Sequence, residues 1–165
     1  MGSSPDRIEK QVVLKAPLAR VWRAVSDAEE FGSWFGARLD GAFAPGVRLT
    51  ASIVPTTVDP QVAASQKAYE GRTFELWVER VEPMRRLSFR WHPFAVDPAA
   101  DLSKEPTTLV VFELEETAGG TRLTITESGF DRLPAERRGK AFEMNDQGWA
   151  AQARLVERYL AGAGR

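Results

Sequence analysis

The chain has 165 residues, of which 43% are hydrophobic and 27% charged, and its formal net charge is -1. This length suits one domain with a sizeable core, and the composition is that of a globular rather than a disordered protein. A near-neutral charge provides no global field to attract nucleic acid or an anionic membrane. We therefore do not expect nucleic-acid binding. No apolar run reaches the length of a membrane span, so we do not expect a spanning segment either.

Cysteine is absent and histidine occurs once, as His92. Disulfides, thiolate nucleophiles and cysteine-ligated zinc are therefore excluded, and a metal site would need carboxylates beside one imidazole. His92 precedes a proline at the edge of a long polar stretch, which favours a structural or turn role. The sequence contains neither a phosphate-binding loop nor a dinucleotide fingerprint nor a signal peptide. We predict a cytoplasmic protein without metal or cofactor.

The N-terminal part of the chain predicts a strand followed by two short helices. The strand covers residues 8–14 and stops at Ala16-Pro17, where proline suits the first turn of a helix. The first helix, at 18–26, carries apolar residues at the three-and-four spacing of one buried face. A second helix is expected at 29–35.

Alternating apolar and polar residues then predict a series of strands. The expected strands are 47–53, 72–81, 87–91, 107–116 and 121–128. Gly119-Gly120 predicts a hairpin turn between the last two. Two polar, proline-containing stretches, residues 55–67 and 92–106, are predicted to be long loops, the first of them mobile over one end of the sheet.

A long helix is predicted at 134–160, because apolar residues now recur every three or four positions. Its inward stripe contains two amides, Asn145 and Gln152, which a purely structural core would avoid because unpaired buried polar groups are costly. The charged residues near the start of the helix are predicted to form its solvated face; they are Glu136, Arg137, Arg138 and Lys140.

Short packing and turn motifs in this order resemble the START-like (SRPBCC) superfamily, in the branch of the activator of Hsp90 ATPase homologue. The resemblance covers residues 8–160. Its motifs are Ala16-Pro17 with Val21-Trp22, Phe31 to Phe35, Gly71, Val81-Glu82-Pro83 with Arg86-Leu87, Phe89 to Pro93, Gly120 to Leu123, Glu127 to Phe130 and Gly148-Trp149.

The resemblance implies an α+β helix-grip fold, in which a curved antiparallel sheet wraps a long C-terminal helix and two short helices follow the first strand. A single domain at 8–161 would follow a short tail at 1–7. The fold also implies a cavity between sheet and helix, but its members range from lipid carriers to cyclases to co-chaperones. The resemblance therefore specifies structure more closely than function.

Glu127 is the most informative single residue, because its alternation with Leu123 and Ile125 directs it toward the interior. A buried carboxylate can serve as a general acid or base, or bind a polar ligand group. Asn145 on the long helix could face the same cavity. Two structural alternatives remain open: Glu127 could hydrogen-bond the turn at the rim, or these two side chains could satisfy each other.

Five tryptophans and nine phenylalanines supply aromatic side chains for a core or for the wall of a site. The candidate ligand-binding residues are Trp34, Phe35, Phe89, Trp91, Phe112, Glu127, Asn145 and Trp149. The favoured function is a binding protein for a hydrophobic or amphipathic small molecule, without turnover. The alternatives are a cyclase- or hydrolase-type enzyme using Glu127, and a stress-response interaction domain whose partner is a chaperone.

Overall fold

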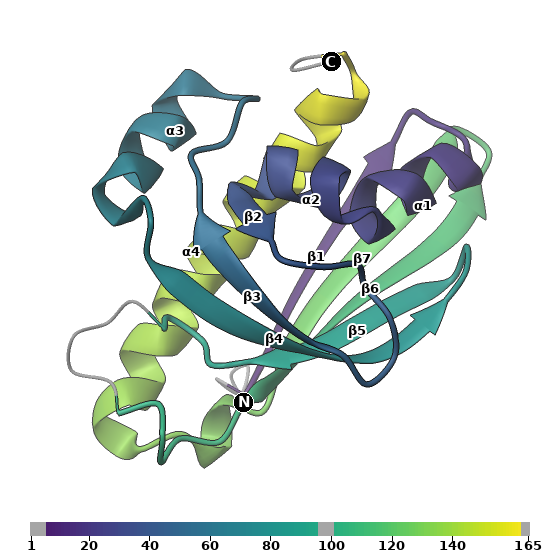
Figure 1. The fold of residues 1–165 in the computed structure, drawn as a ribbon. Coiled ribbons are helices and arrows are strands. Elements are labelled where there is room, and N and C mark those ends of the chain that lie inside the picture. The colour runs from purple at the N-terminus through teal and green to yellow at the C-terminus, as the bar shows by residue number, and fades with distance from the viewer. Residues whose placement is uncertain (1–5, 96–100, 163–165) are drawn as a thin grey trace.

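A seven-stranded antiparallel sheet curves around the C-terminal helix in the computed structural model, which describes residues 6–95 and 101–162 (Figure 1). The strand order in the sheet is β1-β7-β6-β5-β4-β3-β2. The strands are β1 (Arg7–Leu14), β2 (Ala37–Leu39), β3 (Arg48–Ile53), β4 (Thr73–Glu82), β5 (Arg86–Trp91), β6 (Thr108–Thr117) and β7 (Gly120–Ser128). The α+β helix-grip fold predicted from the sequence is confirmed.

Four α-helices and two short 3-10 turns complete the described elements. They are α1 (Leu18–Ser26), α2 (Ala28–Phe35), α3 (Pro60–Gln66), η1 (Lys67–Tyr69), η2 (Phe130–Arg132) and α4 (Ala135–Leu160). In Figure 1, α4 crosses behind the sheet, and α1 and α2 lie beside its C-terminal part. Within the described ranges, no helix is long and apolar enough to cross a membrane.

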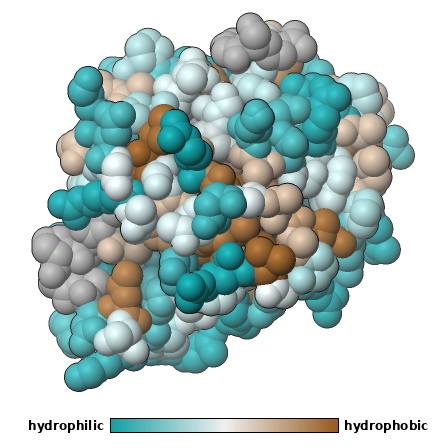
Figure 2. All heavy atoms as spheres, in the orientation of Figure 1, coloured by the Kyte–Doolittle hydropathy of each residue, from teal (hydrophilic) through white to brown (hydrophobic). Residues whose placement is uncertain are grey.

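The core lies between the concave face of the sheet and α4, where alternating strand residues face inward. Fully buried side chains include Leu87 and Phe89 on β5, Phe112 on β6 and Ile125 on β7. Burying side chains of this size contributes about 1.5–3 kcal/mol each. Figure 2 shows that hydrophobic residues also reach the surface in small patches across the middle of one face, among hydrophilic residues. Scattered apolar exposure of this kind is ordinary and needs no partner.

The prediction of a mobile loop at 55–67 is wrong, because this stretch contains α3 and the start of η1. Asp59 caps the helix by accepting hydrogen bonds from the backbone N–H groups of Gln61 (2.8 Å) and Val62 (3.1 Å). Pro60 occupies the first helical position, where its missing N–H costs nothing. The Asp-Pro pair is thus a helix start rather than a loop signal.

The stretch predicted as a loop at 92–106 forms no helix or strand in its described part, and residues 96–100 lie outside the described residues. The predicted tail at 1–7 also lies mostly outside them. The other predicted helices and strands agree with the structure within about two residues. The sequence did not predict β2 or η2, because elements of three residues are too short to show a hydrophobic period.

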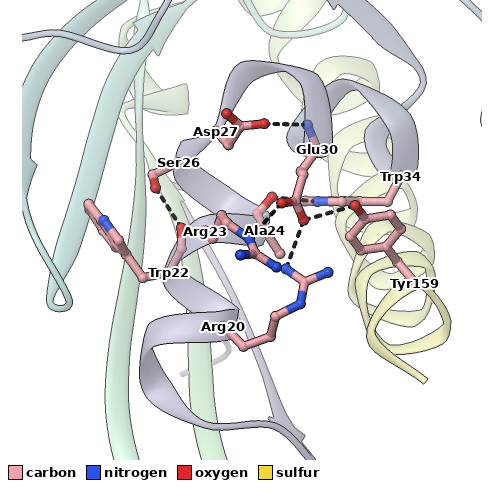
Figure 3. A network of polar contacts seen from close by, with 9 residues as sticks. All are labelled: Arg20, Trp22, Arg23, Ala24, Ser26, Asp27, Glu30, Trp34 and Tyr159. Carbon is pink, nitrogen blue, oxygen red and sulfur yellow. Dashed lines mark hydrogen bonds and ion pairs between the residues drawn. The ribbon is translucent and has the colours of Figure 1, made fainter. Parts of the chain in front are cut away.

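A polar network joins α1, α2 and α4 (Figure 3). Glu30 pairs with Arg20 (2.7 Å) and Arg23 (2.8 Å), and the Tyr159 hydroxyl donates to it at 2.8 Å. Burial opposes the charged form of Glu30, but the hydrogen bonds from Arg20 and Tyr159 and the two positive charges outweigh it. The pKa of Glu30 therefore lies below its usual value.

We expect the Glu30→Gln variant to lose stability in a pH-dependent way. Because the folded pKa is depressed, the carboxylate stabilises the fold above the unfolded value of about 4.3, and this contribution is lost as pH falls through the folded pKa. The penalty should be about 1 kcal/mol at pH 7 and should shrink steadily as pH falls below the unfolded value of about 4.3, measured by urea unfolding. Glu29→Gln, at the exposed neighbouring position, is the control. A penalty that persists unchanged at pH 3 contradicts the assignment.

Candidate functional site

Two adjoining cavities open between α2, the sheet and α4. The larger has a volume of about 200 Å³ and the smaller about 80 Å³. Both are lined by Phe35, Trp91, Asn145 and Gln152, so we call them together the aromatic pocket. The larger part is further lined by Gly36, Ile53, Gln66, Tyr69, Phe74, His92, Phe94 and Ala95, and the smaller by Gly148 and Trp149.

Aromatic rings form the wall of the pocket and pack on one another. Trp91 on β5 and Trp149 on α4 stack with their ring centroids 5.6 Å apart and an interplanar angle of 30°. The ring centroid of Phe35, at the end of α2, lies 6.2 Å from that of Trp91 and 6.0 Å from that of Trp149. Phe74 on β4 meets Trp91 edge-on at 5.9 Å. Such a wall suits a flat apolar ligand.

Glu127 lies behind this wall and holds it in place. Its side chain is completely buried and accepts hydrogen bonds from both stacked indoles, at 2.8 Å from Trp91 Nε1 and 2.7 Å from Trp149 Nε1. Thr108 Oγ1 donates at 2.5 Å, and Asn145 Nδ2 donates to the two carboxylate oxygens at 2.9 and 3.1 Å. These donors converge because β5, β6 and β7 are neighbours and because Asn145 and Trp149 are one turn apart on α4.

The carboxylate of Glu127 is fully engaged by these donors, since a carboxylate offers about four acceptor sites. Among the described residues, no lysine or arginine pairs with it. Burial of a carboxylate is tolerated when hydrogen-bond donors replace water. Glu127 is therefore placed to position Trp91, Asn145 and Trp149 rather than to contact a molecule in the pocket.

Amide side chains connect the pocket to the C-terminus of α2. Phe35 O accepts hydrogen bonds from Gln66 Nε2 (3.1 Å) and from Gln152 Nε2 (3.0 Å). The following residue, Gly36, has φ 97°, and a Cβ there would meet the Gln66 amide at 2.5 Å. Only glycine suits this position, both for its backbone conformation and for the close approach of Gln66.

An ion pair buried inside the protein fixes the stretch that carries His92, Phe94 and Ala95. Arg137 on α4 donates to Glu105 at 2.6 and 2.7 Å, and both side chains are only 3% exposed. Arg137 also donates to Pro93 O (2.8 Å) and Phe94 O (3.3 Å). The prediction that Arg137 belongs to a solvated face is therefore wrong. Its side chain is buried against Glu105, which is 32 residues away in the sequence.

Phe94 is held in an unusual backbone conformation by these contacts. Its φ is 50°, which is uncommon for a residue with a side chain, and its ring lies under Lys140 Nζ at 5.7 Å. His92 beside it contacts Trp77 edge-on at 5.6 Å. Burial, reinforced by the positive charge of Arg137 and opposed by Glu105 and Glu75, lowers the pKa of His92, so the imidazole is neutral at pH 7.

The model of the family described as activator of Hsp90 ATPase homolog 1-like protein matches residues 15–161. The chain belongs to this family. Its membership confirms the resemblance inferred from the sequence motifs. A comparison with the curated proteins found no match.

Several solved structures share the fold of this chain. DynU16, from the dynemicin biosynthetic locus, is 26% identical with a TM-score of 0.68, over 97% of this chain and 49% of its own. The chain thus spans about half the length of DynU16. MLL2253 from Mesorhizobium loti is 24% identical with a TM-score of 0.70, over 94% and 96% of the two chains. A protein from Arthrobacter aurescens is 15% identical, also with a TM-score of 0.70, over 99% and 93%. At 24% and 15% identity the likeness concerns the fold alone.

The structure brings together some of the residues that we predicted from the sequence to bind a ligand. Phe35, Trp91, Asn145 and Trp149 line the aromatic pocket. Glu127 lies directly behind them. Trp34, Phe89 and Phe112 line neither part of it, because they are core residues that are at most 1% exposed. Trp34 instead donates its indole N–H to Ala24 O at 2.9 Å, at the packing of α1 against α2 (Figure 3).

Sequence reasoning missed several residues that line the pocket. Gln66 fell in the first stretch predicted as a loop and Phe94 in the second, whereas Tyr69 lay between the first loop and the next predicted strand. Phe74 and Ile53 belong to predicted strands, and their sequence pattern did not indicate that they would line a pocket. The Asp59-Pro60 helix start would have been a usable signal for Gln66 and Tyr69, since it places both on an ordered segment.

Proposed function

We propose that the protein binds a small, flat, mostly apolar molecule in the aromatic pocket. Support comes first from the wall of rings contributed by Phe35, Trp91 and Trp149. The volume of the larger part, about 200 Å³, is below the usual range of about 300–1,000 Å³ for drug-sized ligands. An apolar cavity of about 150 Å³ is sufficient for benzene. The pocket therefore suits a ligand of one or two rings.

The observation that carries the proposal is the composition of the pocket's lining. Aromatic rings of Phe35, Trp91 and Trp149 border it, and none of the described lining residues is lysine, arginine, aspartate or glutamate. An apolar, aromatic lining with a few polar side chains such as Asn145 and Gln152 is the usual form of a small-molecule site.

The alternative functions receive less support. Use of Glu127 as an acid or base stays a prediction, because its lone pairs are occupied and it lines no described part of the pocket. A chaperone partner also stays a prediction from the resemblance. The binding proposal alone accounts for the pocket and its aromatic lining.

Two glycines of α4 provide a matched test of this proposal. A Cβ added at Gly148 or at Gly139 would meet nothing within 4 Å, but only Gly148 lines the pocket. A leucine at either position also removes a helix-interior glycine, which is stabilising by about 0.5–1 kcal/mol. We expect Gly148→Leu to fold at least as stably as the wild type while obstructing the pocket.

Binding should be followed through the indole N–H signals of Trp91 and Trp149 in ¹H–¹⁵N NMR spectra, during titration with one- and two-ring aromatics such as phenol and indole. In the wild type and in Gly139→Leu, both signals should shift and saturate. Gly148→Leu should weaken binding at least tenfold. If none of the compounds shifts either signal in the wild type, or if Gly148→Leu binds as tightly as Gly139→Leu, the proposal fails.

A further inference from the structure

Glu127 carries a negative charge that is stabilised by neutral groups alone. Its carboxylate is completely buried, and among the described residues no lysine or arginine forms an ion pair with it. Its hydrogen bonds come from Trp91, Thr108, Asn145 and Trp149. The indole and amide N–H groups can only donate, which suits the ionised carboxylate. Such dipoles stabilise the charge without cancelling it, and the protein interior screens it weakly.

One layer of side chains separates this charge from the aromatic pocket. Trp91 Nε1 lies 2.8 Å from Glu127 Oε2, and Trp91 lines both parts of the pocket. Asn145 Nδ2 lies 2.9 Å from Glu127 Oε1, and Asn145 also lines both parts. For two like charges about 7 Å apart, an effective dielectric constant of about 20 makes association about fiftyfold weaker. Glu127 is therefore close enough to change the affinity of a charged ligand without contacting it.

The lining of the pocket does not offset the charge of Glu127. None of the described lining residues is lysine or arginine, and burial lowers the pKa of His92, so its imidazole is neutral at pH 7. The buried Arg137 is already paired with Glu105 at 2.6 Å. An anion would lose its hydration on entering the pocket and would be repelled by Glu127. A neutral ligand avoids both penalties.

Two further cations lie over rings of the pocket lining. The guanidinium of Arg72 is 5.8 Å from the ring centroid of Tyr69, and Lys140 Nζ is 5.7 Å from that of Phe94. Arg72 and Lys140 are both exposed, so water and salt screen their charges. The buried charge of Glu127 is screened much less. Salt concentration therefore separates the effect of the exposed cations from that of Glu127.

We infer that Glu127 determines which ligands the aromatic pocket accepts, by excluding aromatic anions such as carboxylates and phenolates. The ligand is then an uncharged aromatic molecule. Glu127 acts through its charge and not by contact, so it is a specificity-determining rather than a catalytic residue. This inference rests on the proposed function, because it names the class of ligand for the same pocket.

Benzamide, benzoate and benzamidinium form a matched set of probes, because they are similar in size and shape and differ in charge. Dissociation constants come from the NMR titration of the Trp91 and Trp149 indole signals at pH 7. In the wild type, benzamide should bind, and benzamidinium should bind at least about fiftyfold more tightly than benzoate. We call this factor the charge ratio. It should persist at about 0.5 M salt, which screens the exposed cations but not Glu127.

Removal of the Glu127 charge should lower this ratio. Glu127→Gln keeps the shape of the side chain, and the charge ratio should fall at least about tenfold. Glu113→Gln removes a negative charge from an exposed position on β6 and should leave the ratio unchanged within about twofold. Should Glu127→Gln not fold, Glu127→Gln/Trp149→Phe is compared with Trp149→Phe, because the phenyl ring removes the indole N–H that would lose its acceptor.

The possible results separate this inference from the proposed function. A wild-type charge ratio near one, with benzamide bound, overturns the inference and leaves the binding proposal standing. If neither ion binds while benzamide does, the exclusion is not specific to anions, and the role of Glu127 is overturned. A charge ratio that stays the same when Glu127 is replaced also overturns that role. If none of the three compounds binds, the proposed function fails.

Discussion

Glu127→Gln is expected to lower the free energy of unfolding by about 2–4 kcal/mol, although glutamine has nearly the same shape. The amide replaces one carboxylate oxygen by an NH₂ group. Thr108 can rotate and Asn145 can turn over to accept from that group, but an indole N–H can only donate. Whichever way the new amide lies, the N–H of Trp91 or of Trp149 loses its acceptor.

This loss should appear in urea unfolding and as a fall in Tm of about 2–4 °C per kcal/mol. Glu113→Gln is the matched control, because Glu113 lies on β6 with its side chain 46% exposed and pairs with Arg86 at 2.7 Å. That change should cost less than about 1 kcal/mol. Equal penalties at the two positions would contradict the interior role of Glu127. A large loss of stability with unchanged affinity for indole would instead show that Glu127 does not position the pocket wall.

Arg137→Ala should cost about 3–5 kcal/mol, because it leaves the Glu105 carboxylate buried without its counter-ion. It also removes the donors to Pro93 O and Phe94 O, so backbone amides at 92–95 should exchange their hydrogens faster. Urea unfolding and hydrogen exchange measure the two effects. The double variant Glu105→Leu/Arg137→Met should recover most of the stability, since an apolar pair removes both buried charges.

Arg122→Ala provides the control for this ion pair. Arg122 meets Glu115 at 2.7 Å, but the two side chains are 39% and 70% exposed. An exposed pair contributes about 0–1 kcal/mol because water and salt screen it. If Arg137→Ala were no more costly than Arg122→Ala, the Glu105–Arg137 pair would not hold the stretch that borders the pocket.

The sequence predicted the elements with strong periods well, because their patterns arise from one-sided burial. The alternation of Leu123, Ile125 and Glu127 placed Glu127 in the interior, and the spacing of Asn145 and Gln152 placed both amides on the inward side of the long helix. Each of these residues has the predicted environment. Local periodicity is sufficient for such assignments, since it reflects which side of an element faces the core.

Contacts between distant segments could not be predicted in this way. The burial of Arg137 depends on Glu105, which precedes it by 32 residues, and no local pattern marks that pair. Nor does any period reveal that Trp34 and Phe112 lie in the core while Trp91 borders a cavity, since all three fall on inward faces. The distinction depends on where α2, β5 and α4 leave space between them.

Native mass spectrometry of the protein isolated from its own host tests the binding proposal most directly. The wild type should carry one small neutral molecule per chain, released on denaturation, whereas Gly148→Leu produced in the same host should carry none. Identical ligand-free masses for the two proteins would contradict the proposal that the aromatic pocket is a binding site.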